Sequence, residues 1–230
     1  MDWFNSWLHK FYETFIVADR YKTLITGLEK TMIITVGALA IGVIIGTIVA
    51  IIKVFAQDNP KLKLFDIICN IYLTVIRGTP VVVQLFISYF IIFVSAKNGT
   101  WVATVTFGIN SGAYVAEIIR SGIMAVDSGQ MEAGRSLGFS HVQTMKMIIL
   151  PQAFKNVLPA IGNEMIALLK ETSIAGYVAV TDITKAGNQI RNTTYDTSPF
   201  LLVAVVYLAI VMLMTRLLSI LERRLRKSDH

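Results

Sequence analysis

Charged residues are scarce in this sequence. Asp, Glu, Lys and Arg together form 16% of the 230 residues, whereas about 25% is usual in a soluble domain. Hydrophobic residues reach 54%, and the mean hydropathy is +0.62. Because so little polar surface is available to face water, a cytosolic enzyme and a disordered chain are both disfavoured. We expect an integral membrane protein.

Cysteine and histidine are scarce too. The single cysteine, Cys69, excludes an internal disulfide and a cluster of thiolate ligands. The three histidines are scattered, and no G-x-x-x-x-G-K-[ST] phosphate loop is present. The sequence therefore predicts no catalytic residue, no metal site and no cofactor in this chain. The net charge of +6 does not call for a nucleic-acid partner, because Lys and Arg of membrane proteins collect in cytoplasmic loops.

Long stretches without charge are abundant, and they cover 31–52, 81–96, 98–116 and 197–215. A helix needs about 20 mostly apolar residues to cross a bilayer. We therefore predict an all-α, polytopic membrane protein. Its five transmembrane helices are expected at about 24–52, 80–96, 100–124, 154–176 and 198–221.

The distribution of basic residues predicts the orientation. Lys and Arg exceed Asp and Glu in the segments 53–79 and 120–155 and in the C-terminal tail. Such an excess marks cytoplasmic segments. We expect these segments and the C-terminus inside, with the N-terminus and the segment 177–197 outside. The membrane domain would cover 21–226, followed by a short cytoplasmic tail, 227–230.

Residues 1–20 carry aromatic side chains at helical spacing, among them Trp3, Trp7, Phe11 and Phe15. This pattern predicts an amphipathic helix that lies in the membrane interface, with its tryptophans at headgroup depth. The alternative is that the aromatic stripe packs against the protein's own spans.

Two predicted spans carry pairs of small residues four positions apart. The first span has Gly42 and Gly46, and the third has Gly112 and Ala116. Small residues at this spacing allow two helix backbones to approach closely within a membrane.

The segment 125–152 has more internal order than a simple connection needs. Asp127 with Gln130, and Ser140 with Gln143, have the spacing of capping boxes. Gly138 lies where a helix would end in a left-handed residue. We expect a short helix, a turn at Gly138 and a second helix that ends at about Leu150, before Pro151.

The same segment resembles a known motif. Its residues fit the E-A-A-x3-G-x9-I-x-L-P loop of ABC importer permeases, with glycine in place of the second alanine. R-G-T-P at 77–80, N-S-G-A-Y-V-A-E at 110–117, P-Q-A at 151–153 and L-K-E-T-S at 169–173 look like the polar amino-acid branch, which includes histidine, arginine and glutamine permeases. The resemblance covers about 24–226. The residues that match the loop are Glu132, Ala133, Gly134, Gly138, Ile148, Leu150 and Pro151.

This resemblance implies the fold, mechanism and partners. The fold would be the type I ABC importer permease fold, in the bacterial cytoplasmic (inner) membrane. Two permease subunits would form the pathway, and we favour a homodimer because five spans give too little wall to enclose it alone. Each would dock a cytoplasmic ATPase through the 125–152 coupling loop, and that ATPase would bind ATP and magnesium. An extracytoplasmic binding protein would deliver a polar amino acid.

Polar residues within the predicted spans are candidates for substrate contact, because they are costly in a bilayer unless they face protein, water or a ligand. Three of them share one face of the third span, one lies in the second and one in the fourth. The two carboxylates favour a basic or amide-bearing substrate. The alternative is that they form structural pairs, such as Glu117 with Arg120. The candidate substrate-binding residues are Gln84, Asn110, Tyr114, Glu117 and Glu164.

Two other classes of protein are alternatives. A secondary, ion-coupled transporter is the main alternative, although such folds usually contain internal repeats and none is visible here. Residues 134–138 formally match the G-x-S-x-G pattern of serine hydrolases. That pattern requires a strand-turn-helix elbow, whereas these residues have helical neighbours.

Overall fold

The computed structural model describes residues 5, 9, 11–56 and 59–226, and no β-strand occurs among them. This confirms the predicted all-α fold. Shorter turns of π- or 3-10 helix are η1 (Glu13–Val17), η2 (Pro60–Leu62), η3 (Ser88–Ile92), η4 (Met145–Ile149) and η5 (Thr172–Val178). The α-helices are α2 (Tyr21–Ala56), α3 (Lys63–Gly78), α4 (Val81–Ile87), α5 (Gly99–Met124), α6 (Ser128–Ser136), α7 (His141–Thr144), α8 (Leu150–Glu171), α9 (Ile183–Thr194) and α10 (Ser198–Arg226).

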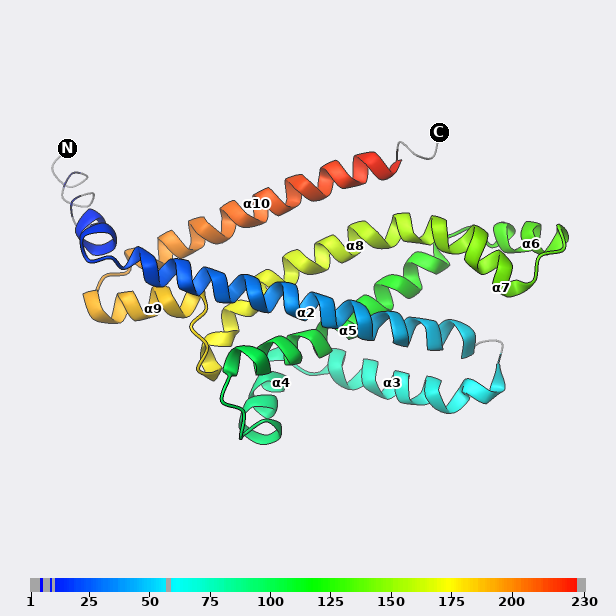
Figure 1. Ribbon diagram of the computed structural model, residues 1–230, viewed down its shortest axis with the longest axis horizontal. Helices are drawn as coiled ribbons and strands as arrows, with labels where there is room; N and C mark the ends of the chain where they lie inside the picture. The colour runs from blue at the N-terminus through cyan, green and yellow to red at the C-terminus, as the bar shows by residue number, and fades with distance from the viewer. Residues whose placement is uncertain (1–4, 6–8, 10, 57–58, 227–230) are drawn as a thin grey trace.

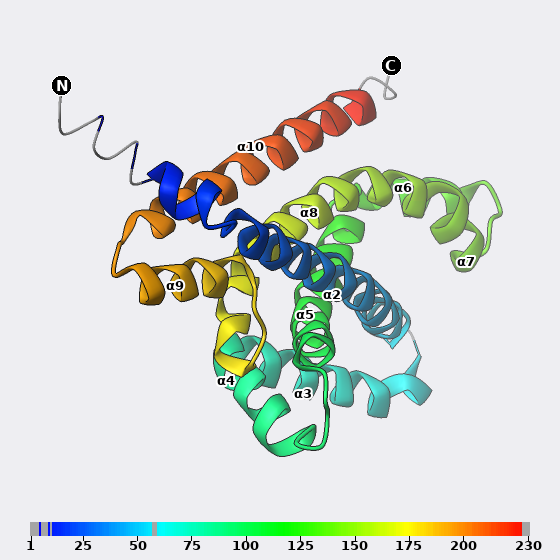
Figure 2. The same cartoon turned by 60° about the vertical axis from the view of Figure 1, so that its left-hand side comes forward.

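The long helices give the molecule two distinct ends. The start of α2, the whole of α9 and the start of α10 lie together at one end (Figure 1). The end of α2, the turn η2, the helices α6 and α7, and the last turns of α10 lie towards the other end. Figure 2 shows α3 and α4 at the opposite edge of the molecule from α10, with α2 and α5 between them.

The predicted number of five spans is not confirmed. Among the described residues, three helices are long and apolar enough to cross a membrane: α2, α5 and α10. A fourth span is possible if the bent pair Pro60–Gly78 and Val81–Ile92 counts as one. The predicted fourth span corresponds to α8, which is amphipathic and carries Pro159 inside the helix.

The predicted second span, 80–96, is the largest correction. Its helical part, Val81–Ile92, rises about 18 Å, which is too short for a hydrocarbon core of about 30 Å. The preceding segment, which the sequence indicated as part of a cytoplasmic loop, is instead the helix α3. The two pieces meet at an angle of 106°. The bend follows from Pro80, because a residue before proline is biased away from the α-conformation and Thr79 is extended.

Helices α2 and α5 pack closely through their small residues. A β-carbon on Gly46 would lie 2.8 Å from the Ala116 backbone nitrogen, and one on Gly112 would lie 2.9 Å from the Ile45 β-carbon. Gly42 faces Ser111 in the same way. The small-residue pairs noted in the sequence therefore form one contact between these two helices.

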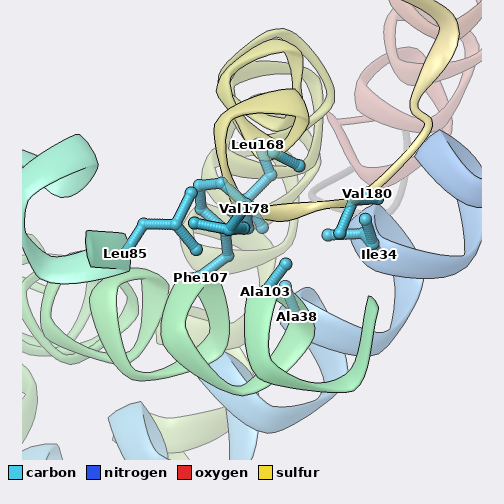
Figure 3. Close-up of a cluster of buried hydrophobic side chains, with 9 residues drawn as sticks. Ile34, Ala38, Leu85, Ala103, Phe107, Leu168, Val178 and Val180 are labelled. Carbon is cyan, nitrogen blue, oxygen red and sulfur yellow. The ribbon is translucent and has the colours of Figure 1, made fainter. Parts of the chain in front are cut away.

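The main apolar core joins α4, α8, η5 and Val180 to this helix pair. Figure 3 shows Leu85, Phe107, Leu168 and Val178 converging on one point. All four side chains are fully buried. Leu85 therefore anchors the short helix α4, and with it the bend, to the rest of the protein.

The segment 177–197, predicted as an outer loop, contains the helix α9. Asp182 caps its first turn, accepting hydrogen bonds from the N–H groups of Thr184 (2.9 Å) and Lys185 (3.2 Å). Ile183, Ala186 and Ile190 are buried on one side of this helix. The polar residues between them concealed this helical spacing in the sequence.

Phe15, of the predicted interfacial helix, is buried in the same cluster as α9 and α10, with 1% of its surface exposed. At this position the aromatic stripe packs on the protein itself. Trp3 and Trp7 lie outside the described residues, as does the tail 227–230. Their interfacial role therefore stays a prediction.

Candidate functional site

The segment 125–152 forms the predicted helix, glycine turn and second helix. Asp127 caps α6 by accepting from the Gly129 N–H at 2.7 Å. Gly138 adopts a left-handed conformation with φ of +89°. A full capping box joins Ser140 and Gln143, with bonds of 3.2 Å and 2.8 Å. These local predictions are confirmed.

Two details of this segment differ from the prediction. Gln130 forms no capping box with Asp127; its side-chain oxygen accepts from the Gln152 amide at 3.4 Å. The second helix does not end before Pro151 but continues through η4 into α8. Proline is accommodated there because the first positions of an α-helix need no N–H partner.

Gly134 holds α6 against the second helix. It is buried, and a β-carbon there would collide with the side chain of Thr144 and lie 3.1 Å from Ile148. Close packing therefore explains why glycine stands at this position in place of the second alanine of the motif. It allows the two short helices to lie closer together than alanine would.

The outer surface of this segment is open. Glu132, Ala133 and Pro151 are exposed, and Leu137, next to Gly138, has 77% of its surface exposed. Val142 and Met147 add further exposed apolar surface. An apolar surface of this kind, beside charged residues, is suited to docking another protein.

The predicted substrate residues fall into three separate contacts along α5. The first is at the bend between α3 and α4. The Gln84 amide donates to the carbonyl oxygens of Ile76 (2.8 Å) and Thr79 (3.1 Å), and to the Thr79 hydroxyl (2.9 Å). Its oxygen accepts from the Asn110 amide at 3.0 Å. Gln84 thus satisfies carbonyls that the broken helix leaves free and ties the bend to α5.

The second contact is between α5 and α8. The buried hydroxyl of Ser111 donates to a Glu164 carboxylate oxygen at 2.8 Å. No ion pair joins Glu164 to Lys170 or to any other cation in the described part of the chain. The carboxylate therefore lies between two helices with one neutral hydrogen-bond donor.

The third contact lines a cavity of about 740 Å³ between α2, α3 and α5. The Arg120 guanidinium donates to both carboxylate oxygens of Glu117, with one bond at 3.2 Å. Arg77 lies over the Tyr114 ring, 5.8 Å from its centroid, and 3.9 Å from Glu117. The cavity is lined by Lys53, Asn70, Leu73, Thr74, Arg77, Gly78, Tyr114, Glu117 and Arg120.

The sequence prediction missed the α3 side of this cavity and left Arg77 out of the pocket. Asn70, Thr74 and Arg77 are three and four positions apart, as on one face of a helix, while Ile67, Ile71 and Val75 on the other side are exposed. This 3.6-residue period is the signal of an amphipathic helix. Here the polar face lines the cavity, and the apolar face points away from the protein.

A metal site is not indicated by the described residues, since no group of three or more His, Cys, Asp or Glu side chains among them is placed to hold an ion. The polar groups that line the cavity are three cations, one carboxylate, one amide and two hydroxyls. They are suited to a polar organic ligand.

Known proteins share both the sequence and the fold. Residues 42–227 match the family described as "Binding-protein-dependent transport system inner membrane component". The chain is 37% identical over 210 residues to the arginine transport system permease protein ArtQ of Bacillus subtilis (strain 168), covering 90% of this chain and 94% of that protein. It is 34% identical over 208 residues to the glutamine transport system permease protein GlnP of Escherichia coli (strain K12), covering 88% and 93%.

Two solved structures are similar. A crystal structure of an amino acid ABC transporter with histidines has a TM-score of 0.83 at 39% identity, covering 90% of this chain and 96% of that chain. An inward-facing structure of the MetNI methionine ABC transporter has a TM-score of 0.77 at 20% identity, covering 89% and 97%. The second likeness is one of fold alone.

Proposed function

This chain belongs to the family of binding-protein-dependent transport system inner membrane components, and we propose that it is the permease subunit of an ATP-driven importer of polar amino acids. Membership confirms the resemblance noted in the sequence and the permease fold, apart from the number of spans. The chain is a multi-pass inner-membrane transport subunit and not an enzyme.

A basic or amide-bearing amino acid is the substrate class that we propose. The relatives named above are an arginine and a glutamine permease, and this chain carries the carboxylates Glu117 in α5 and Glu164 in α8. The observation that carries the proposal is the cavity at Arg77, Tyr114 and Glu117, which has the volume and the charges for a zwitterion. That Gln84 and Asn110 also contact substrate stays a prediction.

The substrate proposal has a direct test. The permease would be purified with its ATPase, and all twenty amino acids would be screened for thermal stabilisation of the complex. Stabilisation by arginine, histidine, lysine or glutamine is expected, because each can present a cation or an amide to a carboxylate. Stabilisation by none of the twenty would contradict the proposal.

We propose that the segment 125–152 docks the ATPase. Its exposed residues lie towards the same end of the molecule as η2, the start of α3 and the end of α10 (Figure 1), and Lys and Arg exceed Asp and Glu in the segment 53–79 and at the C-terminal end. This arrangement supports a cytoplasmic position for all three and an extracytoplasmic position for the start of α2 and for α9. ATP and magnesium would be bound by the ATPase, and a binding protein would deliver substrate at the opposite end.

Gly138 offers a sharp test of docking. A β-carbon there meets no atom within 4 Å, so a substitution acts through the left-handed backbone alone. Gly138→Val should abolish ATP-driven uptake while substrate still binds, because β-branched residues rarely adopt positive φ. Gly138→Asn is the matched control, since asparagine tolerates this conformation. Wild-type uptake by the valine variant would contradict the docking proposal, and uptake without any ATPase would support the secondary-transporter alternative.

We propose a homodimer as the assembled permease. The chain provides three to four candidate spans among the described residues, too few to surround a pathway alone. The helix α10 packs on α8 and α9 and leaves most of its apolar surface exposed. Native mass spectrometry of the purified complex should give two copies of this chain. One copy in an active complex would overturn the proposal.

A further inference from the structure

We propose that Arg77 and Glu117 together bind the α-carboxylate and α-ammonium groups that every amino-acid substrate shares, and so recognise the amino-acid head rather than its side chain. This rests on the proposed function and deepens it.

The three cations that line the cavity differ in what they already bind. The Lys53 ammonium donates to Asp66 (2.9 Å) and Asn70 (2.7 Å). Arg120 donates to Glu117 and to the Met124 sulfur. Arg77, by contrast, forms no hydrogen bond through its guanidinium to any described residue. It is therefore the cation of the cavity whose donors are available to a ligand.

Arg77 is also held in position. Its guanidinium lies over the Tyr114 ring, and 43% of its side-chain surface is exposed, at the cavity. This cation–π contact uses none of the guanidinium N–H donors, so they stay free for a carboxylate, which a planar guanidinium can bind through two parallel hydrogen bonds. Lysine could supply the charge but not this geometry.

The spacing of the two charges matches an amino acid. Arg77 Nη1 and Glu117 Oε2 are 3.9 Å apart, too far for a hydrogen bond. An α-amino acid carries its carboxylate and its ammonium on the same carbon, so it can meet both groups at once. Separating such a half-exposed pair costs little, and Arg120 continues to orient Glu117 while the ammonium binds.

The test compares free amino acids with their α-carboxamides. Arginine and glutamine, each as free acid and as α-carboxamide, would be titrated onto the purified permease–ATPase complex, and dissociation constants measured by calorimetry. The wild type should prefer the free acids by about tenfold or more, the effect of one hydrogen-bonded charge. Arg77→Gln should reduce this ratio to near one while binding of the carboxamides changes little. Arg191→Gln, on the exposed side of α9, is the matched control and should keep the wild-type ratio.

The possible outcomes separate the inference from the proposed function. If Arg77→Gln retains the preference for free acids, or weakens acids and carboxamides equally, the inference is overturned while the proposed function stands. If no amino acid binds the wild type, both fail. Should the glutamine variant not assemble with the ATPase, Arg77→Lys decides: a reduced ratio supports the inference, and an unchanged ratio overturns it.

Discussion

The two faces of the helix α5 differ in the room that they leave for a ligand. Its packed face, formed by Gly108, Gly112 and Ala116, lies against α2 so closely that a β-carbon on either glycine would collide with it. Its polar face carries Asn110, Tyr114, Glu117 and Ser121. The packed face has no room for a ligand, whereas the polar face changes along its length. Asn110 is buried and bonded to Gln84, while Tyr114 and Glu117 border the cavity.

Polar residues within the helices therefore differ in whether their hydrogen-bonding groups are already bonded within the protein. At the Gln84 end of the polar face, the donors and acceptors are occupied by the protein. At the Arg77 end, one guanidinium remains without a hydrogen bond to a described residue. Both ends follow the same sequence rule of polar residues on one helical face, so we propose that the occupancy of the donors distinguishes a structural contact from a binding site.

The largest effect is expected on the packed face. Gly46→Ala should lower the free energy of unfolding by about 2–3 kcal/mol, because the new β-carbon would lie 2.8 Å from a backbone atom of α5. Gly78→Ala, where a β-carbon meets nothing within 4 Å, should be neutral or slightly stabilising. Thermal unfolding of both purified variants measures this. Equal stability of the two would mean that the close approach of α2 and α5 is not required.

A smaller loss of stability is expected at Gln84, the end of the polar face where the hydrogen-bonding groups are bonded within the protein. Gln84→Met keeps the length of the side chain but leaves the Ile76 carbonyl and the Asn110 amide without their partner. We expect a loss of about 1–2 kcal/mol of stability, from unsatisfied buried groups. The preference among amino acids should remain as in the wild type. A changed preference with unchanged stability would instead make Gln84 a substrate contact.

Glu164 lies on α8 and contacts α5 by accepting a hydrogen bond from the Ser111 hydroxyl. Glu164→Gln should shift the preference between arginine and glutamine by about tenfold, the effect of one charge-assisted hydrogen bond. Ser111→Ala is the matched control, because it removes the hydrogen bond and keeps the carboxylate, whereas Glu164→Gln removes the charge and keeps an oxygen that can accept from Ser111. Competition assays on both variants measure the shift. If neither variant alters preference and both lose stability alike, Glu164 is a structural residue.

The sequence predicted best what is local. The conformation of Gly138 and the capping box at Ser140 depend on residues within a few positions of each other, and both were correct. Gly134 was noted only as a departure from a motif, because its neighbour Thr144 comes from the next helix and no local rule links them.

The sequence predicted the helix α3 poorly, because its polar residues line a cavity within the protein. Lys53, Asn70 and Arg77 lie in the segment 53–79, which the sequence predicts as a cytoplasmic loop because Lys and Arg exceed Asp and Glu in it. In the structure they line a cavity, and that environment exists only once α2, α3 and α5 have packed. The apolar side of α3 carried the missing signal, since Ile67, Ile71 and Val75 continue at helical spacing through the supposed loop.

Asp182 is a fully buried carboxylate that belongs to neither face of α5, so it provides a reference for the comparison. We expect its substitution to have the smallest effect on stability. Burial raises the pKa of this carboxyl above its ordinary value of 3.8, although the N–H groups of Thr184 and Lys185 oppose the rise. The folded state then binds a proton more readily than the unfolded state, so stability increases as the pH falls through the folded-state pKa. Asp182→Asn keeps the helix cap and removes the charge.

We therefore expect Asp182→Asn to be as stable as the wild type or slightly more stable at neutral pH, with a difference that shrinks on acidification. Asp182→Ala should instead lose about 1 kcal/mol at neutral pH, because the cap itself is gone, and this loss should grow on acidification because only the wild type gains stability there. Thermal unfolding at neutral and mildly acidic pH measures both variants. If Asp182→Asn alters transport while stability is unchanged, a satisfied buried carboxylate can still be functional, and the rule drawn from the two ends of the polar face fails.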